Sequence, residues 1–460
     1  MFTMTRRVAL VAWGALALLA PASALATSTP EEIANATSGG VTYVKSFQET
    51  NGSIPGFGGD WSLTSLAAAG NAAANVKKTA ESTDARTWYQ SVVGAATFGG
   101  EKPPATEFER GALLAYAAGI DPARPSKRQN LIAKVASYYQ PETPGYYGTV
   151  FNETVFGLLA LADTKTTTGV QRVPQVALDK SIEAVRANQH TDGGWTFSKV
   201  AGSKEAEEAP SEPDMTGAAM AALCTAGVAN TDEAVVAGRE YLESHLVNAS
   251  GAFEAAFGVN TDSNAWGVQG LNACGIAAQG AGFTTAMGKT PIDFLISQKI
   301  AGSGFKYQPA SKSADLNASQ DAVRALAGAG FTATPPVPTG GLPQWKAETE
   351  FGLKSTETVP LALIVDDGSS ALKVCSVTVA PKAATTTLAV VLNAAVAGTT
   401  PASCVTSFLP SSGSGGITQV NGFPKTPEER WNVSIDGAAE KQAKRGTEIR
   451  LGDTIYLHFK

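Results

Sequence analysis

A unit of roughly 50 residues recurs along most of this chain, and it constrains the fold more than any other feature. Three copies are plain in the sequence: QHTDGGWTFS and EPDMTGAAMAAL within 189–223, GAF and NTDSNAWGVQGL within 251–271, and QKIAGSGF and ADLNASQDAVRAL within 298–326. A repeated supersecondary unit buries its apolar face by stacking against its neighbours. The sequence therefore predicts a repeat architecture.

Each unit predicts one amphipathic helix, a turn with glycine and an aromatic residue, and a second helix rich in Ala and Gly. The first helices are expected at 31–48, 83–97, 127–140, 175–189, 231–246 and 287–300. The second helices are expected at 61–70, 107–118, 152–162, 214–227, 262–277 and 318–328.

The two kinds of helix differ in composition. GAAMAALCTAG at 217–227 is small on nearly every side, so we expect such helices to be buried among other helices. The first helices carry charge, for example Lys180, Glu183 and Arg186, and we expect them outside. Six such hairpins predict an all-α α6/α6 toroid over 27–331. An open solenoid of the tetratricopeptide kind is the alternative, but its period of about 34 residues does not fit.

The N-terminus resembles a secretory signal. Arg6 and Arg7 precede an apolar run over 8–19, and small residues follow at 24–26. We expect a signal peptide over 1–26 and a secreted or cell-surface protein. A membrane anchor is the alternative, although the run is shorter than the roughly 20 residues of a span. No later stretch predicts a membrane span.

Charge limits the partners of the chain. Without Arg6 and Arg7, 33 of the 35 Lys and Arg remain against 41 Asp and Glu. Nucleic acid binding requires a basic surface, so we expect no nucleic-acid partner.

The chain has four cysteines, Cys224, Cys274, Cys375 and Cys404. An even number in an exported chain favours disulfides. Pairing Cys224 with Cys274 and Cys375 with Cys404 keeps each bridge within a single domain. Four reduced thiols are the alternative. We expect no metal site, because the chain has no CxxC motif and only three histidines.

The helical pattern ends in a Pro-rich stretch, TATPPVPTGGLPQW, which predicts a linker over 332–353. Residues 354–460 then alternate β-branched and polar residues between Gly, Asn and Asp turns, with one helix candidate at 385–396. This order predicts a small α+β domain.

Gln189, Gly193 and Trp195 form a QxxxGxW motif, with degenerate copies at Gln48 and Gln298. The motif resembles the repeats of squalene cyclases and prenyltransferases. The resemblance implies the toroid, but one toroid serves enzymes and binding proteins alike. The motif itself is expected to be structural, tying one hairpin to the next.

The C-terminal part shows a second resemblance. TTTLAVVLNAA, GGITQVNG, WNVSIDG and LGDTIYLHF follow one another between 385 and 459. The series resembles the C-terminal β-grasp-type domain of the transcobalamin and intrinsic factor family, in which a toroid precedes this domain. The resemblance implies a cobalamin or another corrinoid held between the two domains, with Gly416, Ile417 and Trp431 on the second face. Trp431 as a core aromatic is the alternative.

The residues that cyclase chemistry needs are missing. Squalene-type cyclases protonate an alkene with a DxDD cluster, and this sequence has no DxDD. Asp214 and Asp262 stand as single carboxylates, and Trp61 and Trp266 are the main aromatics on the second helices. The zinc ligand set of a protein prenyltransferase is absent as well. We therefore expect no enzyme. A terpene-cyclase-like enzyme with Asp214 or Asp262 as acid is the minority alternative.

Polar groups at the starts of the second helices suit a ligand site at one mouth of the ring. These candidates are Asp60, Trp61, Asn152, Glu153, Asp214, Asp262, Asn264, Asn317 and Gln320. Helix capping alone could explain Asp214, Asp262 and Asn317. We expect an exported, non-catalytic binding protein for a small molecule, with a corrinoid as the best single ligand and no required cofactor. A surface adhesion or display protein with a protein partner is the other alternative.

Overall fold

The chain is described by a computed structural model. It covers residues 27–55, 58–165, 171–197, 209–341, 358–367, 372–380, 385–398, 404–411, 415–423, 430–450 and 452–459. The expected signal peptide and the second half of the expected linker lie outside these residues. No helix in the described ranges combines the length and the apolar character that crossing a bilayer requires.

Twelve α-helices of the described N-terminal part form six consecutive pairs. The first helices are α1 (Pro30–Ser46), α3 (Ala85–Val93), α5 (Leu131–Ala136), α7 (Gln175–Ala187), α10 (Glu233–Ser244) and α12 (Pro291–Ser297). The second helices are α2 (Ser62–Ala68), α4 (Ala105–Ala117), α6 (Phe151–Ala162), α9 (Pro213–Thr225), α11 (Thr261–Ala273) and α13 (Leu316–Leu326). Each overlaps a predicted range, and the short 3₁₀ turn η1 (Gly59–Trp61) precedes α2.

Helix α5 is much shorter than the range 127–140 predicted for it. The side chain of Asn130 accepts a hydrogen bond from the Ala133 N–H at 2.9 Å, so the helix begins directly after Asn130. Beyond the helix, Tyr139 pairs with Tyr147 in an isolated β-bridge, so that segment is extended rather than helical.

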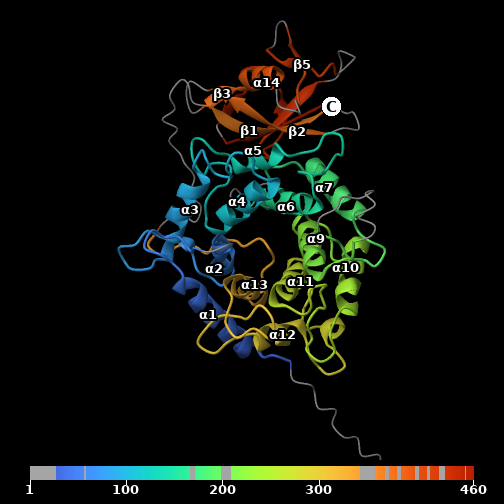
Figure 1. The fold of residues 1–460 in the computed structure, drawn as a ribbon. Coiled ribbons are helices and arrows are strands. Elements are labelled where there is room, and N and C mark those ends of the chain that lie inside the picture. Colours follow the sequence, from blue (N-terminus) through green and yellow to red (C-terminus); the bar gives the residue numbers. More distant parts are fainter. Residues whose placement is uncertain are drawn as a thin grey trace, which may run out of the picture.

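The second helices contact one another in chain order, and α13 contacts α2, so the series closes on itself (Figure 1). Two hydrogen bonds join the ends of the series. Gln320 Nε2 donates to Ser62 Oγ at 2.7 Å, and Ser65 Oγ donates to the Gln320 carbonyl at 2.9 Å. The first helices lie on the outside of this ring.

Helices α9 and α11 approach each other closely enough for their backbones to touch. A Cβ on Gly217 would lie 2.2 Å from the Trp266 carbonyl oxygen, and one on Gly270 would lie 2.4 Å from the Gly217 carbonyl oxygen. The small residues that predicted burial of these helices thus set the distance between them.

The QxxxGxW motif ties neighbouring hairpins together. Gln189 Nε2 donates to the carbonyls of Gly193 and Ala234, both at 2.8 Å. The fully buried Trp195 donates from Nε1 to the Val185 carbonyl at 2.8 Å. Gly193 has φ +88°, and a Cβ there would lie 2.5 Å from the Ala237 carbonyl oxygen. Every group of the motif is therefore engaged in structure.

Both predicted disulfides, Cys224–Cys274 and Cys375–Cys404, are confirmed. The first joins the C-terminal ends of α9 and α11 and closes a loop with a sequence separation of 50 residues. Each bridge lies within a single part of the chain, the first in the helical part and the second in the C-terminal part, as expected.

Replacing Cys224 and Cys274 together by serine is expected to lower the free energy of unfolding by roughly 2–4 kcal/mol, because the unfolded chain regains the freedom of the closed loop. Urea unfolding of the oxidised protein and the double variant measures this difference. Reducing agent should lower the stability of the parent by breaking both bridges. In the Cys375→Ser/Cys404→Ser protein it should lower the stability by the contribution of the Cys224–Cys274 bridge alone. A Cys224→Ser/Cys274→Ser protein with the same free energy of unfolding as the parent would contradict the expectation.

The C-terminal domain is built on a mixed five-stranded sheet with the order β2-β1-β9-β6-β7. Its strands are β1 (Val359–Asp366), β2 (Lys373–Val379), β6 (Trp431–Ile435), β7 (Lys441–Gln442) and β9 (Thr454–Phe459). Strands β1 and β9 are parallel, and the other pairs in this sheet are antiparallel. The remaining elements are β3 (Thr385–Thr387), α14 (Leu388–Ala397), β4 (Phe408–Pro410), β5 (Ile417–Val420) and β8 (Glu448–Arg450).

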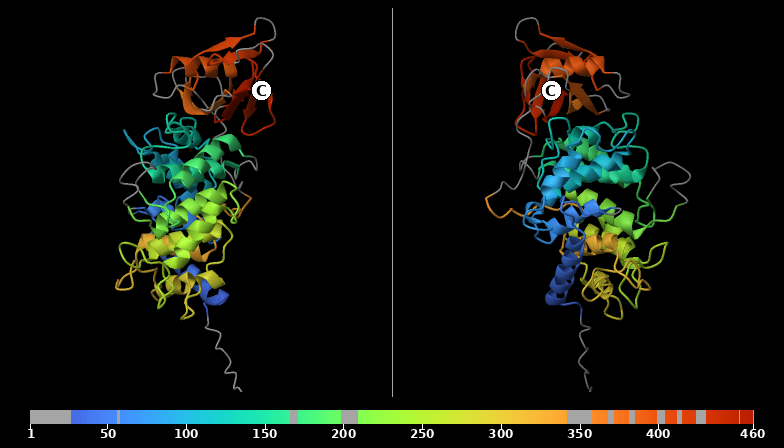
Figure 2. Two further views of the ribbon diagram at one scale, coloured as in Figure 1. Left: turned by 90° about the vertical axis from the view of Figure 1, so that its right-hand side faces the viewer. Right: turned by 60° about the vertical axis from the view of Figure 1, so that its left-hand side comes forward.

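Both faces of this sheet are covered. Leu361, Leu363 and Val365 of β1 share a core with α14, whereas Ala362 and Ile364 belong to the core of the helical part. This alternation follows from the two-residue period of a strand. The second face packs on α5, which contacts β1 and β2. The sheet therefore stands at the outer edge of the ring, beyond α5 (Figure 2).

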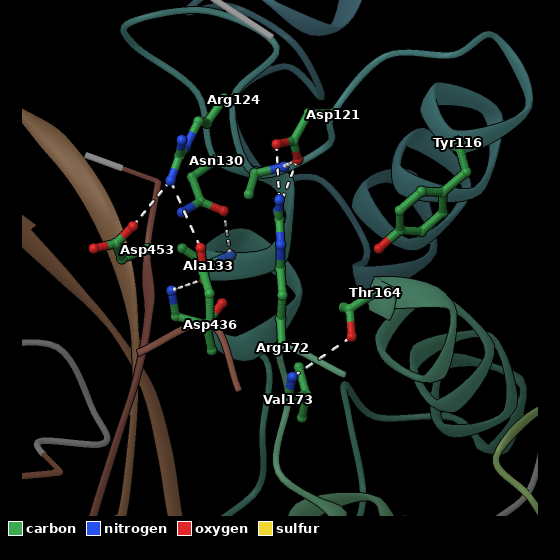
Figure 3. Close-up of polar contacts among 12 residues, drawn as sticks. Tyr116, Asp121, Arg124, Asn130, Ala133, Thr164, Arg172, Val173, Asp436 and Asp453 are labelled. Atoms are coloured by element: carbon green, nitrogen blue, oxygen red, sulfur yellow. Dashed lines mark hydrogen bonds and ion pairs between the residues drawn. The ribbon is translucent and has the colours of Figure 1, made fainter. Parts of the chain in front are cut away.

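Ion pairs add to this contact (Figure 3). Arg124 Nη2 lies 2.9 Å from Asp453 Oδ1 and 3.6 Å from Asp436 Oδ2. Gly452 has φ +93°, and a Cβ there would lie 2.5 Å from Arg124 Cγ. The turn before β9 is thus fitted closely to the helical part.

Candidate functional site

A cavity of about 1160 Å³ opens on the side of the ring where the second helices begin. Its wall is formed by η1, by the first turns of α4, α9, α11 and α13, and by residues of α3. The volume exceeds the range of about 300–1,000 Å³ that is common for small-molecule sites.

Six of the nine candidate residues predicted in the helical part line this cavity. They are Asp60, Trp61, Asp214, Asp262, Asn317 and Gln320. They come from four hairpins, and the closure of the ring brings them together.

The other three helical candidates do not line the cavity. The buried carboxylate of Glu153 accepts hydrogen bonds from the N–H groups of Ala105 at 2.9 Å and Thr149 at 2.5 Å. The buried side chain of Asn264 bonds the N–H of Phe253 at 2.6 Å. Asn152 lies in the first turn of α6, outside the cavity wall. Glu153 and Asn264 are therefore structural groups.

The three C-terminal candidates are buried in the sheet domain and do not line this cavity, so the structure does not place them on a ligand face. Trp431 is fully buried in the core of the sheet domain with Ile417, and its Nε1 donates to the Phe423 carbonyl at 3.0 Å. Gly416 forms a β-bridge with Lys444. The physical reason is the docking of the sheet on α5, which leaves the domain beside the ring.

The helix-capping alternative is wrong for Asp262 and Asn317. The N-caps of α11 and α13 are Asn260 and Asp315, whose side chains accept from the N–H groups of Ser263 at 2.8 Å and Ala318 at 2.9 Å. The α9 helix has Glu212 at its N-cap position, so Asp214 lies one residue inside the first turn. Asp262 and Asn317 are therefore not the caps of their helices, whereas Asp214 accepts the first-turn N–H of Met215. All three line the cavity.

Two arginines on the wall were missed by the sequence analysis. Arg110 binds Asp60 at 2.5 Å and Glu107 at 2.8 Å. The Glu107–Arg110 spacing on α4 could have indicated a pair, but its extension to Asp60 depends on the fold.

The second arginine, Arg324, is almost fully buried. It forms an ion pair with Asp321, donates to Thr64 Oγ1 at 3.0 Å, and lies 4.9 Å from the centre of the Trp61 ring. Its partners lie on α2 and α13, so this cluster also joins the two ends of the ring.

Aromatic side chains are more numerous here than the sequence suggested. Trp61 and Trp266 line the cavity and pack on Phe156, with ring centres 6.4 and 5.9 Å away. Phe331 packs on Trp266 at 4.9 Å. Further aromatic residues reach the wall from α3 and from loops, which periodicity on the second helices could not reveal: Trp88, Tyr89, Phe257 and Tyr307.

Burial disturbs the ionisation of the wall carboxylates. It raises the pKa of Asp214. For Asp262, burial first and then the charges of Asp321 and Asp315 raise the pKa to about 8, although Arg324 opposes the shift. Asp262 Oδ1 is buried without a hydrogen-bond partner among the described residues. Asp262 is therefore a carboxyl group that stays largely protonated at neutral pH.

Replacing Asp262 by asparagine is expected to stabilise the unliganded protein at pH 8 by on the order of 2 kcal/mol. Because the pKa of Asp262 is raised in the folded state, the folded protein keeps this proton between about pH 4 and pH 8, where the unfolded protein has already released it. Stability from this group thus falls as pH rises through that window, and the asparagine removes the loss. Urea unfolding at pH 5 and pH 8 measures the effect.

The exposed Asp179→Asn on α7 is the control for loss of one negative charge. A smaller advantage of Asp262→Asn at pH 8 than at pH 5 would contradict the assignment.

The chemistry available to this wall is limited. No group of three or more His, Cys, Asp or Glu residues that could hold a metal ion occurs within the described part of the chain. Alkene protonation requires a strong acid, whereas Asp262 is a weak one. The wall offers hydrogen bonds, negative charge and aromatic surface.

A second, shallower hollow of about 630 Å³ lies between the two domains. Residues 171 and 173–176 form one side, and residues of β6 and of the turn after it form the other. None of the predicted site residues lines it.

No protein-family model matches the sequence, and no curated protein matches it. Among solved structures, the chain is similar to the type II terpene cyclase MstE from Scytonema, with 13% identity, a TM-score of 0.45, and coverage of 65% of this chain and 98% of that one. It is also similar to haptocorrin in complex with Cbi, with 13% identity, a TM-score of 0.34, and coverage of 94% and 96%. The ent-copalyl diphosphate synthase from Streptomyces platensis is 17% identical, with a TM-score of 0.39 and coverage of 59% and 50%. The similar structures thus include a terpene cyclase and a haptocorrin.

Proposed function

We propose that this chain is an exported, non-catalytic protein that binds a small organic molecule in the cavity at the second-helix starts. The cavity is the observation on which the proposal depends. Its volume of about 1160 Å³ and its mixture of carboxylates and aromatic rings suit a ligand of considerable size.

Three features support the wider proposal. The closed series of helix contacts supports the α6/α6 toroid over 27–331. The mixed sheet with one parallel pair and a covering helix supports a β-grasp-like domain over 354–460. The two disulfides support an oxidising compartment, as expected for a secreted or surface protein with a signal peptide over 1–26.

A corrinoid is the ligand implied by the sequence resemblance to the transcobalamin family, and we retain it as the first compound to test. It would bind in the helical cavity, because the sheet domain lies beyond α5. A display protein would need no cavity, so the hollow favours a small-molecule ligand over a purely adhesive role.

The test is binding to the chain from residue 27 onward and to a variant whose cavity is filled. Cobalamin is titrated and followed by its absorbance, and a mixture of small metabolites is screened by native mass spectrometry. Asn317→Trp places a large ring in the cavity, and Thr106→Trp does so from another part of the wall. We expect a bound compound whose affinity falls at least tenfold in both variants.

Three results would overturn parts of the proposal. Equal binding to the parent and to both folded tryptophan variants would place the ligand elsewhere. A lack of any response to cobalamin would remove the corrinoid. Formation of a cyclised product from squalene or a prenyl diphosphate would overturn the non-catalytic assignment.

A further inference from the structure

The charged groups that line the cavity are unequal in number. The described wall has five carboxylates and two arginines, and it has no lysine or histidine. Arg110 is engaged by Asp60 and Glu107, and Arg324 is engaged by Asp321. Two carboxylates therefore form no ion pair among the described residues, although the charge of Arg324 acts on one of them.

These two carboxylates are Asp214 and Asp262. Asp214 accepts the N–H of Met215 at 2.8 Å and its own backbone N–H, both on its own helix. Asp262 Oδ1 is buried without a hydrogen-bond partner in the described chain. Burial raises the pKa of both groups, so an ionised pair is unfavourable until a positive charge joins it.

Aromatic side chains stand on the same side of the cavity. Phe257 is 84% exposed and Tyr307 is 37% exposed, although both line the hollow. The two loops touch, since Gln308 Nε2 donates to the Phe257 carbonyl at 3.4 Å. The Thr261 N–H donates to the Tyr307 carbonyl at 2.7 Å, so Tyr307 is held beside the residue that precedes Asp262, and both line the same wall as Asp214.

A metal ion does not fit this arrangement. Calcium takes six to eight oxygen ligands, and the two carboxylates supply too few. A positively charged ammonium group on an organic molecule requires fewer and looser contacts. It is attracted by carboxylates and by the faces of aromatic rings. The wall of the cavity already holds a cation over an aromatic ring, since Arg324 lies over the Trp61 ring.

We propose that the ligand of this cavity presents an organic cation, a protonated amine or a quaternary ammonium, to Asp214 and Asp262 beside Tyr307 and Phe257. This inference rests on the proposed function that the cavity is a binding site. It adds the chemical class of the ligand group that contacts these four residues. The rest of the ligand contacts the aromatic surface of Trp61 and Trp266.

The test compares two probes of nearly equal shape. Choline carries a trimethylammonium group, and 3,3-dimethyl-1-butanol carries a neutral tert-butyl group in its place. Ligand-observed NMR titration of the chain from residue 27 onward gives both affinities at pH 7.5. We expect choline to bind at least tenfold more tightly.

Variants test which residues cause the preference for choline over the alcohol. Asp214→Asn/Asp262→Asn should bring the two affinities within about twofold of each other, whereas the exposed Asp179→Asn should leave the preference unchanged. Tyr307→Leu should weaken choline more than the alcohol. Thermal unfolding confirms that each variant is folded. If the double variant does not fold, Asp214→Asn and Asp262→Asn are measured singly, and each should reduce the preference.

Equal affinities of the unmodified chain for the two probes, or no binding of choline, would overturn the inference. So would a preference that survives in the folded double variant. Failure of the proposed function would give a different result. In that case a compound would still bind to the Asn317→Trp and Thr106→Trp variants, in which the cavity is filled. A neutral ligand displaced by those variants would uphold the site and reject the cation.

Discussion

Replacing Gly217 by valine is expected to destabilise the helical ring by about 4 kcal/mol or more and to leave little folded protein at 37 °C. Even a single Cβ at this position would lie 2.2 Å from the Trp266 carbonyl oxygen and 2.8 Å from Gly267 Cα. Both atoms belong to the backbone of α11, so no side chain can move aside. The two helices would have to separate, with loss of packing along their whole contact.

The alanine variant separates packing from helix propensity. In an exposed helix, alanine is more favourable than glycine by about 1 kcal/mol. Gly217→Ala should nevertheless be less stable than the parent, because the close approach dominates. Circular dichroism with urea unfolding measures both variants. A Gly217→Ala protein more stable than the parent would show that the helices are not in backbone contact.

Gly446→Ala is the matched control. A Cβ at Gly446 meets no atom within 4 Å, and its backbone does not adopt a positive φ. The same chemical change should therefore alter stability by less than about 1 kcal/mol there. A large loss at Gly446 as well would point to a general intolerance of the fold and not to the α9–α11 contact.

The helices could be predicted because their signal is local. Small residues at 217–227 and 265–275 indicate burial on all sides, and the repeated motif gives the spacing of the units. Helix α5 was overestimated because the cap at Asn130 and the bridge between Tyr139 and Tyr147 override the apolar pattern.

The disulfide pairing could be predicted for a different reason. Confining each bridge to one compositional region left a single pairing, and the structure has that pairing. The boundary between the regions, visible as a change from Ala-rich to β-branched sequence, was sufficient.

The position of the sheet domain could not be predicted. It depends on the alternation of β1, which gives Ala362 and Ile364 to α5, and on the fit of Gly452 to Arg124. The continuous apolar run of β1 shows that both faces of the strand are buried, but it does not say which helix covers the second face. For this reason Ile417 and Trp431, which were expected on a ligand-binding surface, could not be assigned from the sequence to the core of the sheet domain, where they lie.

The candidate site was predicted in part. Polar residues at the second-helix starts do gather on one cavity, because consecutive hairpins present equivalent positions to the same mouth. The partners Asp60 and Arg110, or Thr64 and Arg324, come together only through closure of the ring. Their separations of 50 and 260 residues exceed anything that a local pattern records.

Replacing Arg324 by methionine is expected to lower the free energy of unfolding by about 3–5 kcal/mol at pH 7.5. The change leaves Asp321, which is 8% exposed, without its cation. It also removes the donor to Thr64 Oγ1 and the charge over the Trp61 ring. Methionine restores most of the apolar volume, so the loss reports the unpaired charge more than a cavity.

The double variant Asp321→Asn/Arg324→Met tests this cause. It removes the stranded charge while the Trp266 indole can still donate to the amide oxygen, as it now donates to Asp321 Oδ2 at 2.9 Å. We expect it to be at least 1.5 kcal/mol more stable than Arg324→Met alone. Burial already raises the pKa of Asp321, and loss of Arg324, which opposes that shift, raises it further. The defect of Arg324→Met should therefore shrink at pH 5, where Asp321 takes up a proton, and grow toward pH 8. A double variant no more stable than Arg324→Met, with a defect independent of pH, would mean that Arg324 stabilises the ring through packing and not through its charge.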